Sequence, residues 1–341
     1  MTGGSTKGIG LALISSASFS TSGAFARSLA GAHWSPAAVV VARCLLAAVF
    51  LAIPAYRELR GRWWILRKNS ALIVAYGSIP IAACQLSYFN AVGHLAVGIA
   101  LLLEYLGIVL VVGYLWLKGQ RPRRLTVIGS IVALIGLAFV IDLFGSHRFD
   151  MIGLAWGLVA AVGLAVFFIL SSQEGEGLPP SVLACGGALV GGTLILVVGL
   201  LGIAPLHATT EQVVLAGQAT IWAVPVVGLA AISFAIPYVV GIRATRMLGP
   251  KLSSFISLTE VIFATLFAWA MLGELPTAIQ LVGALIIVAG VTLVRLDELG
   301  QTERSPTARE GAAAECEARA GRNKKPRGWA YESRARSASA E

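Results

Sequence analysis

Long apolar segments that alternate with short polar connections dominate this chain. A membrane-spanning helix needs roughly 20 predominantly apolar residues, and ten windows of about that length follow one another between residues 8 and 296. The pattern therefore predicts an all-α integral membrane protein with ten transmembrane helices. The windows are residues 8–31, 36–56, 70–91, 95–117, 125–144, 150–172, 181–203, 218–242, 250–272 and 277–296.

The composition agrees with a bundle of helices in lipid. Apolar residues make up 57% of the 341 residues and charged residues only 13%. In soluble domains apolar residues average about 45–50% and charged residues about 25%. Residues 297–341 differ, because they are rich in Ala, Glu, Arg and Ser and poor in large apolar side chains, which is typical of disorder. We expect a disordered cytoplasmic tail there, either solvated or in contact with anionic lipid.

The basic residues are concentrated in alternate connections. If the amino terminus is cytoplasmic, thirteen bases lie on the cytoplasmic side and two, Arg27 and Arg148, on the other. Cytoplasmic loops normally carry the excess of Lys and Arg, so both termini are predicted to be cytoplasmic. The excess of bases in cytoplasmic connections accounts for the net charge of +9, so this charge is no evidence for a nucleic-acid partner. The thirteen bases are Lys7, Arg57, Arg60, Arg62, Arg67, Lys68, Lys118, Arg121, Arg123, Arg124, Arg243, Arg246 and Lys251.

The chain contains an internal duplication. Residues 91–140 and 244–294 follow one pattern, in which Ala91 aligns with Ala244 and Trp116 with Trp269. An odd number of spans in each copy turns the second copy upside down in the membrane, and inverted repeats are typical of secondary transporters. We therefore expect an inverted five-plus-five repeat, with spans one to five in residues 1–145 and spans six to ten in residues 150–296.

Three stretches of the chain carry a family resemblance: Gln85–Ala91 with Val97–Gly107, Pro237–Glu260, and Leu272–Leu275 with Gly283 and Gly290–Leu293. They resemble the EamA family of the drug/metabolite transporter superfamily, and most of all its threonine and homoserine exporter branch. The resemblance implies ten spans in an inverted repeat and a place in the bacterial inner membrane. In one respect the chain departs from the family, which normally has proline where Ile108 and Val261 stand. Because proline kinks a helix, we expect straighter fourth and ninth spans.

Three charged residues, Arg43, Glu104 and Glu260, lie away from the ends of their predicted spans. Charges at the bilayer centre are costly and normally face the bundle interior, where they mark substrate or ion pathways. We expect Glu104 and Glu260 to hold a substrate ammonium group or to exchange protons. The alternative is a fixed ion pair, such as Arg43 with Glu104, that only orients helices. Arg43 could also bind a substrate carboxylate. In the alignment Glu104 stands beside Ser257, so the two acids are not symmetric.

Neutral polar residues near the ends of spans three and eight complete the candidate site. They could offer hydrogen bonds to a zwitterion, or they could simply bond one helix to another. Tyr88 could instead anchor its helix at the membrane interface. These neutral candidates are Gln85, Tyr88, Asn90, Ser233 and Tyr238, to which the alignment adds Ser257.

The remaining patterns exclude several classes of protein. No phosphate-binding loop, metal-ligand spacing or nucleophile–base grouping is present, so we expect no cofactor, no metal and no enzyme activity. We predict a secondary active transporter that exports an amino acid or related zwitterion by alternating access and proton antiport. The alternatives are a multidrug or other metabolite exporter, or a membrane receptor or assembly protein that does not transport. The expected partners are a small substrate, the lipid bilayer and protons, and the chain could form a homodimer.

Overall fold

The described part of the chain is helical apart from one β-hairpin. The computed structural model describes residues 2–94, 97–120, 122–140, 150–215, 217–272, 278–279, 281–294 and 296–297. Met1–Val294 form one unit and Arg295–Glu341 a second. Beyond Asp297 the predicted tail lies outside the described residues, so the expectation of disorder stays a prediction.

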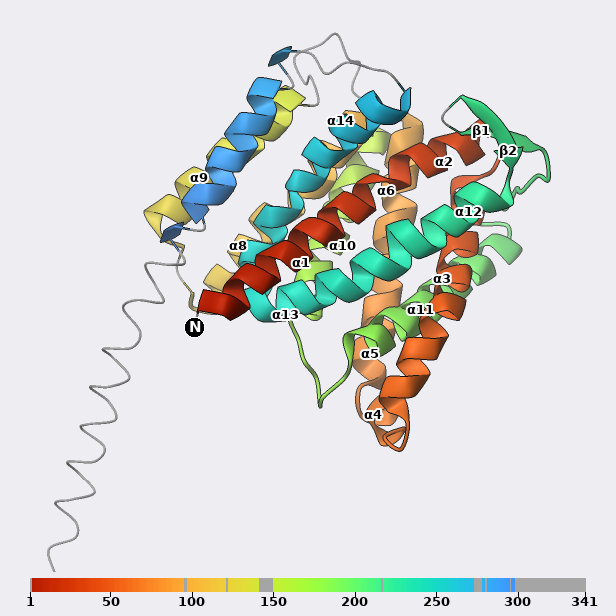
Figure 1. Cartoon of the computed structure of the whole chain (residues 1–341), viewed down its shortest axis with the longest axis horizontal. Coiled ribbons are helices and arrows are strands. Elements are labelled where there is room, and N and C mark those ends of the chain that lie inside the picture. Colours follow the sequence, from red (N-terminus) through yellow and green to blue (C-terminus); the bar gives the residue numbers. More distant parts are fainter. Residues whose placement is uncertain are drawn as a thin grey trace, which may run out of the picture. The chain divides into compact units, whose positions relative to one another are not determined.

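The first predicted repeat contributes nine α-helical segments and one π-helical segment to the described residues (Figure 1). Helices α1 and α2 together fill the first predicted span, and the third and fourth spans also consist of more than one segment. The segments are α1 Thr2–Ser20, α2 Ser22–Gly31, α3 Pro36–Leu59, α4 Trp64–Lys68, α5 Ser70–Tyr76, η1 Gly77–Ala83, α6 Cys84–His94, α7 Val97–Tyr105, α8 Gly107–Leu117 and α9 Arg124–Val140.

The second predicted repeat is built in the same way, with a short antiparallel hairpin added before its third span. In that hairpin Gln212 pairs with Ile221 and Leu215 with Gln218. The segments are α10 Met151–Ser171, α11 Pro180–Leu200, β1 Gln212–Leu215, β2 Gln218–Ile221, α12 Ala223–Ala230, η2 Ala231–Ala235, α13 Ile236–Ser257, α14 Thr259–Leu272 and a last helix, Leu281–Val294.

Six helical stretches among the described residues are long and apolar enough to cross a membrane. Each of the ten predicted windows contains helix, but the others are shorter or interrupted, so the number of crossings, the inversion and the side of the termini stay predictions. The eighth window was placed too early, because residues 218–221 form β2. The six stretches are Thr6–Gly31, Pro36–Leu59, Ser70–Ala91, Met151–Ser171, Pro180–Leu200 and Ala223–Ser257.

The third and eighth spans each contain a π-helical segment in the middle. Segment η1 includes Pro80, and η2 ends just before Pro237. Proline lacks an N–H and its ring clashes with the carbonyl four residues earlier, so the hydrogen bonds around it shift. In the register that aligns Ala91 with Ala244, Pro80 stands beside Ser233, so both predicted repeats are distorted at corresponding positions in the sequence.

The expectation of straighter fourth and ninth spans is wrong. Although Ile108 and Val261 replace proline, the regular helical hydrogen bonding stops at Leu106 and at Leu258. The N–H groups of these two leucines bond to the carbonyl three residues earlier, at 3.1 and 3.2 Å. The fourth span is therefore divided into α7 and α8, and the ninth is divided between the end of α13 and α14.

Side chains explain the interruption in the ninth span without proline. The hydroxyls of Ser254, Ser257 and Thr259 each donate to the backbone carbonyl three residues earlier, at 2.6–2.7 Å. Such bonds compete with the helical ladder and bend helices. The ninth span also starts sharply, because Gly249 adopts φ 81° directly before Pro250.

The fifth and tenth spans are helices without a break among the described residues, and they pack against each other through small residues. Figure 1 shows α9 beside the last helix. A Cβ atom on Gly136 would lie 2.6 Å from the Ile287 nitrogen, and one on Gly290 would lie 2.6 Å from the Ala133 nitrogen. Small residues at such contacts let helix backbones approach closely in a membrane. We call this contact the glycine seam.

The connections at one end of the helices, the end that holds α4, are joined by charged groups. Lys68 lies 2.5 Å from Glu176, and the Glu58 carboxylate lies 3.5 Å from Arg243 and accepts a hydrogen bond from Ser181. All these segments were predicted to be cytoplasmic, and they do meet at one end. We call it the basic end.

The β-hairpin lies at the opposite end of the helices. There, hydrogen bonds join loops that are far apart in the sequence. Trp34 donates its indole N–H to the Thr209 carbonyl (2.9 Å). Asp150 caps α10 by accepting the Ile152 N–H (2.8 Å) and lies 2.9 Å from His94 Nδ1. The backbone hydrogen bond, followed by the contact with His94, lowers the pKa of Asp150.

Candidate functional site

A small cavity lies among helices of both predicted repeats. Its volume is about 100 Å³. A water molecule needs about 10–15 Å³ by a comparable measure, so the cavity holds several waters or a small solute. Pockets for drug-sized ligands are larger, about 300–1,000 Å³. The polar lining residues are Ser15, Ser16, Ser22, Arg43, Cys84, Gln85, Tyr88, Glu104, Tyr105, Tyr238, Thr245, Ser253, Ser257 and Glu260.

Most of the predicted site residues meet at this cavity, although they come from five different spans. Two predicted residues do not line it. Asn90 donates to the Leu86 carbonyl within its own helix (2.7 Å), and Ser233 lies 2.8 Å from the Thr21 hydroxyl. Ser233 therefore makes the contact between helices that was the alternative, whereas Asn90 bonds within its own helix. The predicted residues on the cavity are Arg43, Gln85, Tyr88, Glu104, Tyr238, Ser257 and Glu260.

Arg43 is the buried cation of the site. Its side chain comes from the amino-terminal half of α3 and is 2% exposed. One guanidinium nitrogen donates to Gln85 Oε1 (2.9 Å), and the group lies 5.4 Å from the centre of the Phe234 ring. Its Nε has no hydrogen-bond partner among the described residues. Buried donors without a partner are costly, so this nitrogen has capacity for a ligand or for water.

The suggested ion pair between Arg43 and Glu104 does not form. Within the described residues no carboxylate oxygen lies within 4.0 Å of Arg43. Gln85 takes the position next to the guanidinium instead and supplies a neutral oxygen. Arg43 therefore keeps its positive charge available to the cavity.

Glu104 sits at the end of α7, just before the interruption at Leu106, and is 9% exposed. The Cys84 thiol is 3.5 Å from Glu104 Oε1 and 3.4 Å from the Ala160 carbonyl. A thiol is a weak donor. The Glu104 carboxyl group therefore has little support from its own repeat and faces the cavity.

Glu260 sits on the opposite side of the repeat boundary, in the first turn of α14. The interruption at Leu258 makes this turn a helix start, and the N-terminal end of a helix favours a negative charge. The Tyr105 hydroxyl, which comes from the other repeat, lies 3.0 Å from Glu260 Oε2. Glu260 therefore has stronger support than Glu104, and that support crosses between the repeats.

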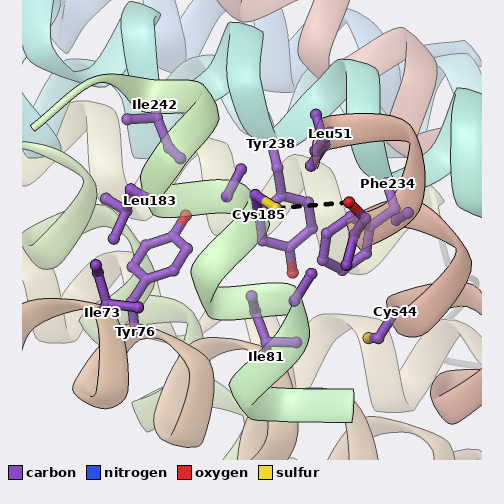
Figure 2. Close-up of a cluster of buried hydrophobic side chains, with 14 of the residues drawn as sticks. Cys44, Leu51, Ile73, Tyr76, Ile81, Leu183, Cys185, Phe234, Tyr238 and Ile242 are labelled. Carbon is purple, nitrogen blue, oxygen red and sulfur yellow. Dashed lines mark hydrogen bonds between the residues drawn. The ribbon is translucent and has the colours of Figure 1, made fainter. Parts of the chain in front are cut away.

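Aromatic rings form the wall of the cavity near Arg43. Tyr238 stacks on Phe234 with ring centres 4.1 Å apart, and its edge contacts Phe19 and Phe167 at 5.2 and 5.6 Å. Figure 2 shows Tyr238 and Phe234 together with Tyr76 in the buried cluster next to the site. This wall fixes the ring positions and keeps water away from one side of the guanidinium.

Several lining residues were not predicted from the sequence. Tyr105 follows Glu104 directly in the sequence. That its hydroxyl contacts Glu260 of the second repeat could be known only from the fold. Ser15 lies in the serine-rich first span, and it donates to the Pro237 carbonyl (2.9 Å). Within the described residues no group of three His, Cys, Asp or Glu side chains could hold a metal ion.

Comparison with known proteins gives the family. Residues 6–142 and 151–296 each match the EamA-like transporter family. An uncharacterized transporter of Archaeoglobus fulgidus is 25% identical over 207 residues, which are 61% of this chain and 70% of that protein. The uncharacterized transporter YdfC of Bacillus subtilis is 24% identical over 171 residues, half of this chain and 52% of that protein.

A solved structure shares the fold. A crystal structure superposes with a TM-score of 0.67 over 86% of this chain and 97% of the other, at 18% sequence identity. At that identity the likeness concerns the fold alone. None of these matches singles out the threonine and homoserine exporter branch.

Proposed function

The chain belongs to the EamA-like transporter family and is a multi-pass membrane transporter, and we propose that it exports an amino acid or a related small zwitterion by proton antiport. In this proposal residues 1–145 and 150–296 are inverted repeats that rock against each other in a bacterial inner membrane. Both termini lie in the cytoplasm.

One observation carries the choice of substrate: a single small cavity holds one buried cation and two acids without an ion pair between them. Arg43 presents its Nε, which has no hydrogen-bond partner in the described part of the chain, and Glu104 and Glu260 lie on other helices around the same space. A zwitterion satisfies both kinds of charge at once, since guanidinium binds carboxylate and carboxylate binds ammonium. The volume of about 100 Å³ favours a small substrate.

The unequal number of charges supports proton coupling. With the substrate carboxylate on Arg43 and its ammonium on one acid, the second acid has no countercharge in the cavity. Burying an uncompensated charge is expensive, so that acid binds a proton whenever the cavity is closed. A proton carrier must also be stable after it releases its proton, and the Tyr105 hydroxyl and the helix start stabilise ionised Glu260. We therefore assign proton exchange to Glu260 and the substrate ammonium to Glu104.

The interruptions in the spans support alternating access. The fourth and ninth spans each change hydrogen-bond pattern beside an acid of the site, and such discontinuous helices form the binding sites of many transporters. The ion pairs at the basic end, such as Glu58 with Arg243, link segments of both repeats and would have to open to admit substrate from that side.

The proposal is tested with the purified full-length chain in liposomes under an imposed pH gradient. Uptake of small neutral amino acids into the acidic interior is expected to exceed that of protein-free liposomes and to stop when the gradient is collapsed. If no amino acid or related zwitterion moves under any gradient, the proposal is wrong.

The aromatic wall favours a second candidate, a drug exporter on the same fold. Phe19, Phe167 and Tyr238 offer faces to a lipophilic cation, and ring faces attract cations. The same liposomes distinguish the two candidates, because a drug exporter would move lipophilic amines without moving amino acids.

A further inference from the structure

The Tyr105 hydroxyl connects the two repeats at the interruption in the ninth span. Tyr105 is the last residue of α7, is 3% exposed and lines the cavity. Its oxygen lies 3.0 Å from Glu260 Oε2 and 3.0 Å from the Ser257 carbonyl oxygen. Ser257 ends α13 and Glu260 lies in the first turn of α14, so one hydroxyl contacts both sides of the interruption at Leu258.

The hydroxyl cannot make a full hydrogen bond to both acceptors at once. A phenol has a single proton to donate. An ionised carboxylate is the better acceptor, because charge-assisted hydrogen bonds are shorter and stronger than neutral ones. A protonated carboxyl group loses this advantage, and the backbone carbonyl then competes for the proton. The acceptor that Tyr105 uses therefore depends on whether Glu260 carries a proton.

The backbone acceptor lies where the helix changes its hydrogen bonding. In a regular helix the N–H of Val261 would be directed to the Ser257 oxygen, but here it bonds to the Leu258 oxygen at 3.2 Å. Inside a membrane, backbone groups must find partners within the protein. Whether Tyr105 donates to Ser257 therefore matters to the local geometry of the ninth span.

We propose that Tyr105 is a positioning residue that transmits the charge state of Glu260 to the interruption at Leu258, and so couples proton binding to the contact between the repeats. This inference rests on the proposed function of the cavity as a proton-coupled site. The other titratable or charged groups that act on the pair are Glu104, Tyr88 and Arg43.

The test compares Tyr105→Phe with the unmodified chain in the same liposomes, with exchange measured as a function of pH. The hydroxyl stabilises ionised Glu260, so its loss should move the pH of half-maximal exchange upward by about one unit, the size expected for one hydrogen bond to a charged group. Tyr76→Phe is the matched control, since Tyr76 is also buried and bonds to Ser171 (3.1 Å) but does not line the cavity. Its pH profile should not move.

A second measurement does not depend on substrate. Infrared difference spectra recorded against pH follow the carboxyl C=O band, which Glu260→Gln assigns. In Tyr105→Phe that band should titrate at higher pH and change frequency, because its hydrogen-bond donor is gone. If the Glu260 band titrates identically in both proteins, the inference is overturned. If the unmodified chain transports nothing while the band still shifts in the variant, the proposed function fails and the linkage stands.

Discussion

Two pairs of helices in this transporter differ in how they are built. The fourth and ninth spans are interrupted at Leu106 and Leu258 and each carries an acid that lines the cavity. The fifth and tenth spans are continuous among the described residues and meet in the glycine seam. Interrupted helices can change local hydrogen bonding at small cost, whereas closely packed backbones resist it. We therefore expect binding and proton exchange to involve the fourth and ninth spans, and the fifth and tenth spans to support them without changing shape.

The two acids of the interrupted pair are themselves unequal. Among the described residues, Glu104 receives a hydrogen bond from the Cys84 thiol of its own repeat alone, whereas Glu260 contacts Tyr105 of the other repeat. Although the spans are repeated, Glu104 and Glu260 therefore lie in different surroundings. This difference is the reason for assigning binding to one acid and proton exchange to the other.

The largest expected effect tests that assignment. Glu260→Gln should reduce pH-driven uptake to the level of protein-free liposomes, because the proton carrier is lost, while exchange of labelled for unlabelled substrate at equal pH continues. Glu104→Gln is the matched variant. It should keep pH-driven uptake but raise KM by about tenfold or more, the loss expected for one charge-assisted hydrogen bond. If both variants behave alike, the two acids share one role.

Arg43→Gln sharpens the comparison from the side of the cation. We expect KM for a zwitterionic substrate to rise by about tenfold to a hundredfold, since a charged bond to the carboxylate is lost. Competition by an amine without a carboxylate should be unaffected. Competition assays with matched pairs of amino acid and amine measure this difference, and Arg43→Lys, which keeps the charge, should lose less. If Arg43→Gln weakens competition by the amino acid and by the matched amine equally, the assignment of Arg43 to the substrate carboxylate is wrong.

Gly136→Ala tests the supporting pair. The added Cβ would meet the Ile287 nitrogen at 2.6 Å and the Gly283 oxygen at 2.8 Å, so the helices must separate. Overpacking of this kind costs about 1–3 kcal/mol, which should lower the thermal unfolding temperature in detergent. Gly113→Ala in α8 is the control, because its Cβ would meet nothing within 4 Å. An unchanged unfolding temperature in Gly136→Ala would show that the seam is not tightly packed.

The smallest expected effect concerns Asp150, outside the spans. Its hydrogen bonds with Ile152 and His94 lower its pKa from 3.8. A lowered acid pKa adds stability above the unfolded-state value, and that stability is lost as the pH falls through the folded-state value. Asp150→Ala should therefore unfold at a slightly lower temperature at pH 7, and the difference should shrink as the pH falls below about 4, where the Asp150 carboxyl group of the folded protein becomes protonated. Asp150→Asn should keep the helix cap but lose the pH dependence.

The sequence predicted the helices and many of the residues that meet at the cavity, because apolar length and intramembrane charge are local signals. Glu104, Glu260 and Arg43 could be selected for that reason alone. Asn90 and Ser233 could not be excluded, because the partner of a hydroxyl or amide depends on which helix lies next to it.

The interruptions were harder to predict. The absence of proline at Ile108 and Val261 suggested straight helices, but hydroxyl groups near Leu258 compete for the backbone carbonyls and produce a break by another route. The role of Tyr105 was hidden for a related reason, since its acceptors lie more than 150 residues away in the chain. Contacts of this kind depend on how the repeats are packed together.

The π-helical segments have a consequence for comparing relatives of this chain. A π-helical segment amounts to one inserted residue in an α-helix. Because the wider turn takes up the extra residue, deleting one residue from Gly77–Ala83 would restore regular helix and leave the helical segments on either side in place. Gln85 and Tyr88 would still line the cavity. Relatives that differ by one residue in length at this point can therefore keep the same site, and an alignment that places the gap elsewhere in the span would pair the wrong residues with Gln85 and Tyr88.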